Sequence, residues 1–198
     1  MKVLLATSNP GKLRELQALL ADSGIQVLPQ TAFQVREAPE TGLSFVENAL
    51  LKARNAARQT GLPSIADDSG LEVDALHGAP GIYSARYAGP GASDADNINK
   101  LLRDLQYLPM EKRTARFRCS MTYLRDAADA APLICEGVWE GRILEAPRGK
   151  NGFGYDPVFL VPERQCSSAE LGPTDKNRLS HRGQALRKLV AQLTAVPG

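Results

Sequence analysis

The segment VLLATSNPGKLRELQALL, residues 3–20, decides the class of fold to which this chain belongs. Its first four residues, Val3–Ala6, form an unbroken apolar run that is typical of a short buried strand. The turn-forming triplet NPG follows at residues 9–11. A helix is then predicted to begin near Lys12, because leucines recur on one of its faces. A strand, a loop and a helix in this order are the first unit of an α/β fold.

Downstream segments repeat the alternation of strand and helix. Residues 27–28 are a candidate second strand. Ser44 and Glu47 form a capping-box pattern, which opens an alanine-rich helix predicted over residues 45–59. Residues 64–66 then predict a short buried strand that ends at a pair of aspartates.

A hairpin is predicted in the second half of the chain. Apolar and polar residues alternate over 115–123, which indicates a half-buried strand, and residues 133–139 would pair with it. A last helix is predicted over residues 182–193. Because a hairpin coexists with strand–helix alternation, the sequence predicts an α/β fold with a mixed β-sheet flanked by helices. A single domain over residues 1–198 is expected.

Composition narrows the range of partners and compartments. The chain has 24 basic and 22 acidic residues and a net charge of +2, too even a balance to predict a nucleic-acid or membrane surface. No apolar run in the sequence approaches the ~18–20 residues needed to span a bilayer. The three cysteines are widely spaced and match neither a disulfide framework nor a zinc site, so a reducing cytoplasm is expected.

The first candidate binding segment lies between the first predicted strand and helix. Backbone N–H groups and a helix N-terminus would converge there on an anion, and the lysine adds a charge suited to phosphate. The spacing differs from that of a P-loop, and an ordinary turn with a solvated lysine is the alternative. The residues are Thr7, Ser8, Asn9, Pro10, Gly11 and Lys12.

The second candidate is the pair Asp67 and Asp68. Two carboxylates at the end of a buried strand are costly unless they hold a cation or meet partners. Successive strand residues point to opposite faces, so at most one of them would point into a given cleft. Hard oxygen ligands suit magnesium, and Glu40, in the loop before the second helix, is a reasonable further ligand. A turn with solvated acids is the alternative, and Glu47 is already explained by the capping box.

The third candidate is the motif GFGYDP, residues 152–157. Glycines on either side of an aromatic residue let the backbone approach a flat ligand, and the ring offers a face for a base. Basic residues near the start of the last helix could donate to a base carbonyl or a phosphate. A glycine-rich turn and exposed basic residues are the alternatives. The candidate residues are Phe153, Gly154, Tyr155, Asp156, Lys176, His181 and Arg182.

In order and spacing, these motifs resemble the inosine triphosphate pyrophosphatases. The match runs nearly end to end, through TSNPGK, ETGLSFVENA, IADDSGL, GAPGIYSARYAG, GFGYDP, AEL and SHRG. The resemblance implies hydrolysis of inosine, deoxyinosine and xanthosine triphosphates to the monophosphate and pyrophosphate. It also implies magnesium dependence, a homodimer, and an elongated α/β fold of two lobes with the active-site cleft between them.

The resemblance also implies a role for each motif. Asp68 would be the catalytic residue and, with Glu40, a magnesium ligand. The segment of residues 7–12 would grip the triphosphate, with Ser69 beside it. The third group of candidates would form the nucleoside pocket: Phe153, Gly154, Tyr155, Asp156, Lys176, His181 and Arg182. The sequence departs from the family at Gly172-Pro173, which interrupts the usual run before Lys176.

The chemistry expected is attack of water on the α-phosphorus, with pyrophosphate as the leaving group. Asp68 would orient or deprotonate the water, while Lys12 and Mg²⁺ neutralise the leaving charge. One rival interpretation is a related pyrophosphatase for other modified nucleotides, and another is a non-enzymatic nucleotide- or RNA-binding module. The scattered Lys and Arg residues argue against the last, and neither a stable nucleic-acid partner nor a membrane partner is expected.

Overall fold

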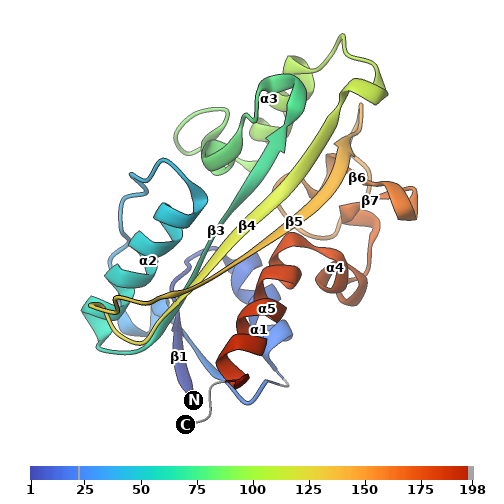
Figure 1. Cartoon of the computed structure of the whole chain (residues 1–198). Helices are drawn as coiled ribbons and strands as arrows, with labels where there is room; N and C mark the ends of the chain where they lie inside the picture. The colour runs from blue at the N-terminus through green and yellow to red at the C-terminus, as the bar shows by residue number, and fades with distance from the viewer. Residues whose placement is uncertain (22, 196–198) are drawn as a thin grey trace. The chain divides into compact units, whose positions relative to one another are not determined.

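A computed structural model describes residues 1–21 and 23–195 of the chain. They form a mixed α/β structure in which helices flank a seven-stranded sheet of order β2-β1-β3-β4-β5-β6-β7 (Figure 1). The strands are β1 (Lys2–Leu5), β2 (Gln26–Pro29), β3 (Ser64–Val73), β4 (Thr114–Leu124), β5 (Leu133–Ile143), β6 (Phe159–Val161) and β7 (Cys166–Ser167). The α-helices are α1 (Pro10–Leu20), α2 (Phe45–Thr60), α3 (Asp94–Asp104), α4 (Pro173–Leu179) and α5 (His181–Ala195).

The directions of the strands confirm that the sheet is mixed. β1 pairs in parallel with both β2 and β3, whereas β6 pairs antiparallel with β5 and β7. The parallel part is built by the strand–helix units of the N-terminal region. The predicted hairpin strands, β4 and β5, are neighbours in the sheet.

The chain divides into two compact units. Unit 1 contains residues 1–68 and 119–137 and the chain from residue 182 onward; unit 2 contains residues 69–118 and 138–181. The long strands β3, β4 and β5 therefore contribute residues to both units. Each unit has an apolar core of its own. A single domain over residues 1–198 stays a prediction.

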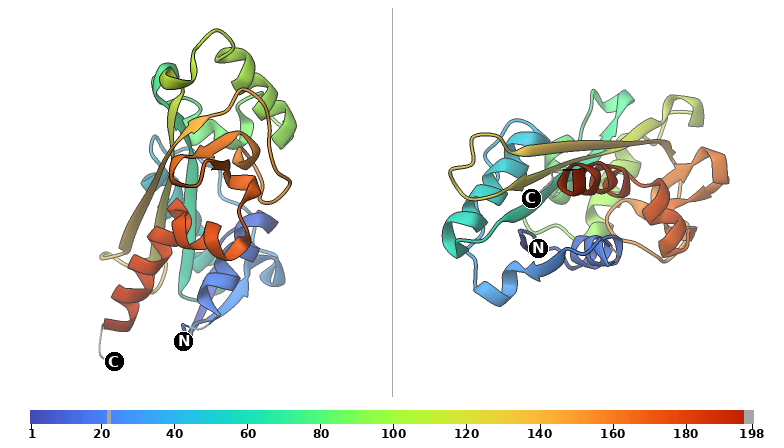
Figure 2. Two further views of the ribbon diagram at one scale, coloured as in Figure 1. Left: turned by 90° about the vertical axis from the view of Figure 1, so that its right-hand side faces the viewer. Right: turned by 60° about the horizontal axis from the view of Figure 1, so that its bottom comes forward.

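In unit 1 the alternation of side chains along β1 separates two apolar clusters. Val3 and Leu5 pack with the leucines of α1 and α5, whereas Leu4 and Ala6 pack with the alanines of α2. Figures 1 and 2 show α1 and α5 next to each other. Both faces of this part of the sheet are covered, which explains why its first strand is an unbroken apolar run. For the same reason the second half of β4 is buried on both faces, and only its first half shows the predicted alternation.

The ends of two helices depend on individual polar side chains. α1 begins at Pro10, earlier than predicted, because Asn9 caps it and proline suits the first helical position. In α2, Ser44 Oγ accepts the predicted hydrogen bond from the Glu47 N–H at 3.2 Å. The Glu47 carboxylate, however, accepts from the Leu43 N–H at 2.7 Å, so the second half of the predicted capping box is displaced by one residue.

The core of unit 2 is built round three aromatic rings. The ring centroids of Phe117 and Phe159 are 4.4 Å apart, and those of Trp139 and Phe159 are 5.2 Å apart. Helix α3 covers this cluster with fully or nearly fully buried side chains at Ile98 and Leu101. The core thereby fixes α3 against the strands of its own unit.

The prediction that a short strand ends at Asp67 is wrong. β3 is ten residues long and runs through both aspartates to Val73. Leu71 and Val73 are completely buried in the core of unit 2, which keeps the chain extended beyond the small residues that looked like a turn. Asp67 and Asp68 are therefore side chains of a continuous strand, whose directions alternate.

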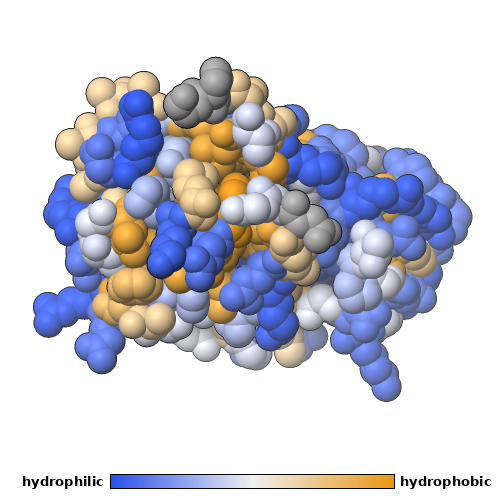
Figure 3. Space-filling view, turned by 90° about the horizontal axis from the view of Figure 1, so that it is seen from below, coloured by the Kyte–Doolittle hydropathy of each residue, from blue (hydrophilic) through white to orange (hydrophobic). Residues whose placement is uncertain are grey.

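The described residues contain no helix whose length and apolar character would let it cross a bilayer. Apolar side chains are visible among polar ones on the face seen from below (Figure 3). The large hydrophobic side chains exposed in the described chain include Met1, Leu43 and Tyr107. Scattered exposure of this kind is ordinary on protein surfaces.

Candidate functional site

The two adjacent aspartates of β3 meet different helices within unit 1. Asp67 Oδ2 lies 3.0 Å from Lys12 Nζ of α1 and accepts a hydrogen bond from Arg182 Nε of α5 at 3.3 Å. Asp68 Oδ1 instead accepts from Lys52 Nζ of α2 at 2.8 Å. This division follows from the alternation of side chains along a strand. Asp67 therefore binds basic side chains of α1 and α5, whereas Asp68 binds a lysine of α2.

Asp67 is a completely buried counter-ion. Burial raises the pKa of a carboxyl group, but Lys12, Arg182 and Lys52 outweigh it and hold the pKa of Asp67 well below its ordinary value. Arg182 is also bound by the carboxylate of Glu15, and its side chain is 3% exposed. Asp67 is thus a permanent anion that holds the predicted phosphate-binding lysine and Arg182.

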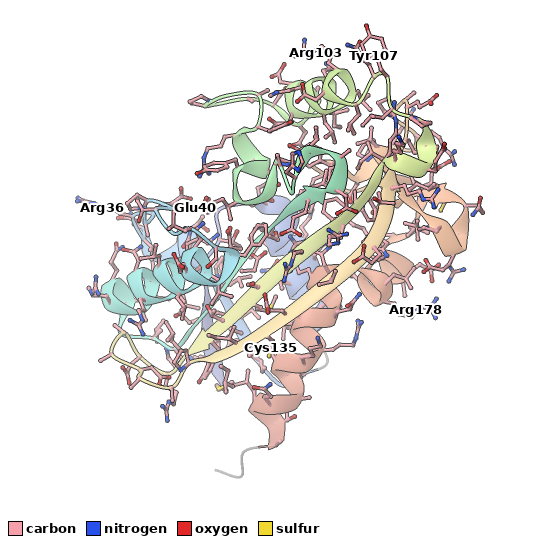
Figure 4. All side chains as sticks on the ribbon, turned by 45° about the horizontal axis from the view of Figure 1, so that its top comes forward. Arg36, Glu40, Arg103, Tyr107, Cys135 and Arg178 are labelled. Atoms are coloured by element: carbon pink, nitrogen blue, oxygen red, sulfur yellow. The ribbon has the colours of Figure 1, made fainter. Side chains whose placement is uncertain are left out.

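Asp68 and Glu40, the two predicted metal ligands, are joined by a lysine. Lys52 Nζ lies 2.9 Å from Glu40 Oε1 and 2.8 Å from Asp68 Oδ1. Figure 4 shows Glu40 on the segment that precedes α2. Burial raises the pKa of Asp68, and the nearby charges of Lys52 and Lys12 offset only part of that rise. Asp68 is therefore a stronger base than an exposed aspartate.

Lys52 remains an ammonium in this position. Burial alone would lower its pKa, but the carboxylates of Asp68, Asp67 and Glu40 more than compensate and raise the pKa of Lys52 above its ordinary value. Lys52 is a site residue that the sequence motifs do not reveal, although a signal is present. Lys52 falls on the buried stripe of α2, three residues after Ala49 and four before Ala56, where a lysine without a partner would be costly.

The residues round Asp68 fit a magnesium ion. Asp68 Oδ2 is buried and has no hydrogen-bond partner among the described residues, and Glu40 brings a second carboxylate to the same ammonium. Within residues 1–21 and 23–195, no three His, Cys, Asp or Glu side chains gather in a way that could bind a metal by themselves. Magnesium rarely needs such a cage, because it usually takes one or two carboxylates together with waters and substrate phosphates.

The predicted phosphate-binding segment is shaped by its own side chains. Asn9 Oδ1 accepts hydrogen bonds from the N–H groups of Gly11 at 2.9 Å and Lys12 at 3.1 Å. Thr7 Oγ1 accepts from the Asn9 N–H at 3.2 Å, and the Ser8 hydroxyl donates to the Glu37 carboxylate. Because Asn9 already occupies two of the amides at the helix N-terminus, the Lys12 ammonium is the main positive charge that this segment offers an anion.

In unit 2, Asp156 gathers the predicted nucleoside-binding residues. Its Oδ2 accepts from the Phe153 N–H at 2.9 Å and from Lys176 Nζ at 2.6 Å, and its Oδ1 accepts from Ser168 Oγ at 2.9 Å. Lys176 Nζ also lies 5.0 Å from the centroid of the Phe153 ring. Phe153, Asp156 and Lys176 thus form one group. Asp156 is 3% exposed, so its carboxylate is buried and holds Phe153 and Lys176 in place.

The departure at Gly172-Pro173 is the start of helix α4, which the sequence patterns do not predict. Gly172 is the N-cap residue of α4, and Pro173 takes the first helical position, as proline does readily. This helix carries Lys176 into the unit, where the lysine side chain is 7% exposed. Gly172-Pro173 therefore does not disturb the position of Lys176, which lies within a regular helix.

Two other predicted residues, Tyr155 and His181, contact protein partners of their own. The Tyr155 hydroxyl donates to the Ser84 carbonyl at 2.8 Å, and the Tyr155 side chain is buried. The His181 ring stacks on Phe117 with the centroids 4.8 Å apart and the planes inclined by 15°. Ser69 lies half-buried in β3, next to Asp68 in the chain. Tyr155 and His181 are held in place by unit 2 itself.

These features define a class of protein first. It is an α/β protein in which buried carboxylates hold ammonium groups beside a strand–helix loop, and in which a second group presents an aromatic ring beside a lysine. The ammonium groups of unit 1 suit an anionic ligand, and the aromatic ring of unit 2 offers a stacking face to a flat one.

Comparison with known proteins then gives the family. The Ham1 family model matches residues 3–192, and the chain belongs to that family. It is similar to the dITP/XTP pyrophosphatase of Thioalkalivibrio sulfidiphilus, with 62% identity over 193 residues that cover 98% of each chain. The dITP/XTP pyrophosphatase of Vibrio cholerae is 61% identical over 188 residues, which cover 95% of this chain and 94% of that one. A solved HAM1 protein from Coxiella burnetii has a TM-score of 0.91 at 53% identity, covering 99% of this chain and 100% of that one. The resemblance inferred from the motifs is confirmed.

Proposed function

We propose that this chain hydrolyses the non-standard purine nucleoside triphosphates dITP, ITP and XTP to the monophosphate and pyrophosphate, removing them from the nucleotide pool. The observation that carries the proposal is the Lys52 ammonium between the carboxylates of Glu40 and Asp68. In this proposal Asp68 is the general base, the carboxylates of Asp68 and Glu40 are the metal ligands, and Lys52 is a cation for phosphate. The names of the relatives, dITP/XTP pyrophosphatases, support the choice of substrate.

The triphosphate is assigned to residues of unit 1, with Ser69 beside them in the chain. Lys12 and Lys52 supply positive charge, and the segment of residues 7–12 contacts the phosphates. Glu40 and Asp68 are the residues that would hold Mg²⁺, which when bound withdraws charge from phosphate oxygens. Asp67 keeps Lys12 in place, and it needs no contact with the substrate to do so.

The reaction is displacement at the α-phosphorus. The water oxygen forms a bond to that phosphorus, the bond to the bridging oxygen breaks, and pyrophosphate leaves with the electron pair. Asp68 accepts the proton of the water, a role favoured by the raised pKa that burial gives it. Lys12 and Lys52 offset the charge that develops on the phosphates, and such charge stabilisation is a major part of phosphoryl-transfer catalysis.

The purine base is assigned to the group of unit 2 that contains Phe153, Asp156 and Lys176. Phe153 stacks on the purine, while donors from Lys176 and His181 favour a carbonyl at its 6-position. Hypoxanthine and xanthine carry that carbonyl, whereas adenine carries an amino donor there that would leave buried donors unpaired. Guanine shares the carbonyl and differs from hypoxanthine by its amino group at the 2-position.

A homodimer in the cytoplasm, with no stable nucleic-acid partner, completes the proposal. The three cysteines are free, as suits a reducing compartment. Light scattering should give twice the mass of the 21.4 kDa chain; the mass of one chain would contradict the dimer.

A panel of triphosphates at fixed Mg²⁺ tests the activity. We expect dITP and XTP to be turned over much faster than dATP and dGTP, with pyrophosphate released. A preference for another modified base would indicate a related pyrophosphatase, and tight binding without pyrophosphate release would indicate a binding module.

The role of Asp68 is tested by Asp68→Asn. Loss of a positioned base should lower turnover by about 10²–10⁴-fold while the variant remains folded. Glu111→Gln, at an exposed acid, is the control and should keep wild-type turnover. Turnover near that of the wild type in Asp68→Asn would remove Asp68 from the mechanism.

A further inference from the structure

The two peptide groups that flank Phe153 are each hydrogen-bonded to a carboxylate. The Phe153 N–H donates to Asp156 Oδ2 at 2.9 Å, and the Gly154 N–H donates to Asp94 Oδ2 at 2.7 Å. Each peptide group is planar, so fixing both of them sets the two backbone dihedrals of Phe153. The direction in which the ring leaves the backbone is therefore set by these two acids.

The backbone of this loop needs such support. Gly152 and Gly154, on either side of Phe153, have φ angles of +76° and +60°. Glycine adopts these left-handed conformations readily, but it also loses more conformational freedom than any other residue when it is fixed. External hydrogen bonds must therefore hold the loop in one conformation.

The two acids differ in where they come from. Asp156 belongs to the loop itself and is held by Lys176 and Ser168. Asp94 lies sixty residues earlier, in the first turn of α3. Its bond to Gly154 has the short length that is usual when the acceptor is charged.

Helix α3 is a firm anchor for this bond. Ser93 and Asp96 form a complete capping box at its N-terminus. The Asn97 side chain accepts from the Ala88 N–H at 2.8 Å and donates to the Ala85 carbonyl at 3.2 Å. With the buried face of α3 packed in the core of unit 2, the position of Asp94 is determined by the fold.

We infer that Asp94 is a positioning residue for the aromatic platform of Phe153. Its carboxylate holds the Gly154 N–H and thereby sets the Phe153 ring for stacking on the purine. This role rests on the proposed function, in which Phe153 stacks on the base. An aspartate in the first turn of a helix also stabilises the helix through its charge, so the test must separate the two effects.

The variants Asp94→Ala and Asp94→Asn make that separation. Asparagine loses the charge but keeps a side-chain oxygen that accepts the Gly154 hydrogen bond, whereas alanine loses both. For Asp94→Ala we expect KM for dITP to rise about threefold to tenfold, the effect of one lost hydrogen bond, while kcat changes little. Asp94→Asn should stay close to the wild-type KM.

Hydrogen exchange gives a readout that does not depend on turnover. The Gly154 amide should exchange faster in Asp94→Ala than in Asp94→Asn, while the amides of α3 change equally in both. Loss of protection in α3 alone, with the Gly154 amide unchanged, would reduce Asp94 to a helix-stabilising residue and overturn the inference.

The two proposals fail in different ways. Turnover of dITP with the same KM in wild type and Asp94→Ala would overturn the role of Asp94 and leave the proposed function intact. Failure of the wild type to turn over any triphosphate in the panel would overturn the proposed function, and the role of Asp94 with it.

Discussion

Replacing Lys52 by methionine removes an ammonium group and keeps a side chain of similar length. In the wild type, Lys52 is 16% exposed and bridges Asp68, which is 8% exposed, and Glu40, which is 30% exposed. The variant Lys52→Met leaves these two carboxylates close together without the cation that balances them. The nearly buried Asp68 then has to keep its charge in a poorly solvated position or take up a proton.

The size of the effect follows from the burial of the three groups. Removing one partner of a buried ion pair costs about 3–5 kcal/mol, and Glu40 keeps enough contact with solvent to place this site at the lower end, near 3 kcal/mol. Mg²⁺ should return part of this loss, because the two carboxylates then bind it without competition from an internal cation. A ligand at ten times its Kd contributes about 1.4 kcal/mol to the folded state.

Urea unfolding, followed by circular dichroism and by the fluorescence of the single tryptophan, Trp139, measures both effects. It is carried out with EDTA and with Mg²⁺. Lys188→Met is the control, because it also replaces a lysine by methionine but at an exposed position. The Lys188 ammonium donates a solvent-exposed hydrogen bond to the Glu136 carbonyl, so this variant should lose no more than about 0.5 kcal/mol of unfolding free energy. The reasoning is refuted if Lys52→Met is as stable as this control in EDTA, or if Mg²⁺ stabilises both variants equally.

Two further predictions concern other parts of the chain. Gly152→Ala would place a Cβ 2.1 Å from Asp156 Oδ2 at a φ of +76°, so it should lose about 2–3 kcal/mol and raise KM for dITP. Gly154→Ala, where a Cβ meets nothing within 4 Å, should lose only the backbone strain of about 1 kcal/mol; equal losses in urea unfolding would contradict the steric explanation. Hydrogen bonds from the Arg125 side chain and backbone hold the pKa of Asp129 well below its ordinary value. The Asp129 carboxylate therefore stabilises the fold at pH values above its pKa in the unfolded chain. This stabilisation is lost as the pH falls through the pKa of Asp129 in the folded protein. Asp129→Asn should therefore be less stable at pH 7 by about 1 kcal/mol, a modest loss because the Arg125 side chain is 65% exposed, and the difference should shrink below about pH 4; a difference that is constant with pH in thermal unfolding would refute this.

The parts of the fold that the sequence predicted are those set by local patterns. The apolar run of β1, the capping serine of α2 and the alternation at the start of β4 each depend on neighbouring residues, and the structure contains all three. The sequence predicts a turn at Asn9 and Pro10, whereas the structure has them as the N-cap and the first helical residue of α1. Local signals thus placed the elements well and their ends less well.

The parts that were missed depend on contacts between distant residues. β3 continues past Asp68 because Leu71 and Val73 enter a core whose other members come from much later in the chain. Lys52 joins Glu40 to Asp68 only after α2 has packed beside β3. The same is true of Asp156, since a short motif does not reveal that its acid will be buried against Lys176.

Hydrolysis of dITP in water labelled with a heavy oxygen isotope tests the central claim most directly. Attack at the α-phosphorus forms the new bond to the nucleotide, so mass spectrometry should find the label in dIMP and leave pyrophosphate unlabelled. Asp68→Asn should form labelled dIMP about 10²–10⁴-fold more slowly, and Glu111→Gln should form it at the wild-type rate. Label in pyrophosphate, or the products dIDP and labelled phosphate, would contradict the proposed reaction.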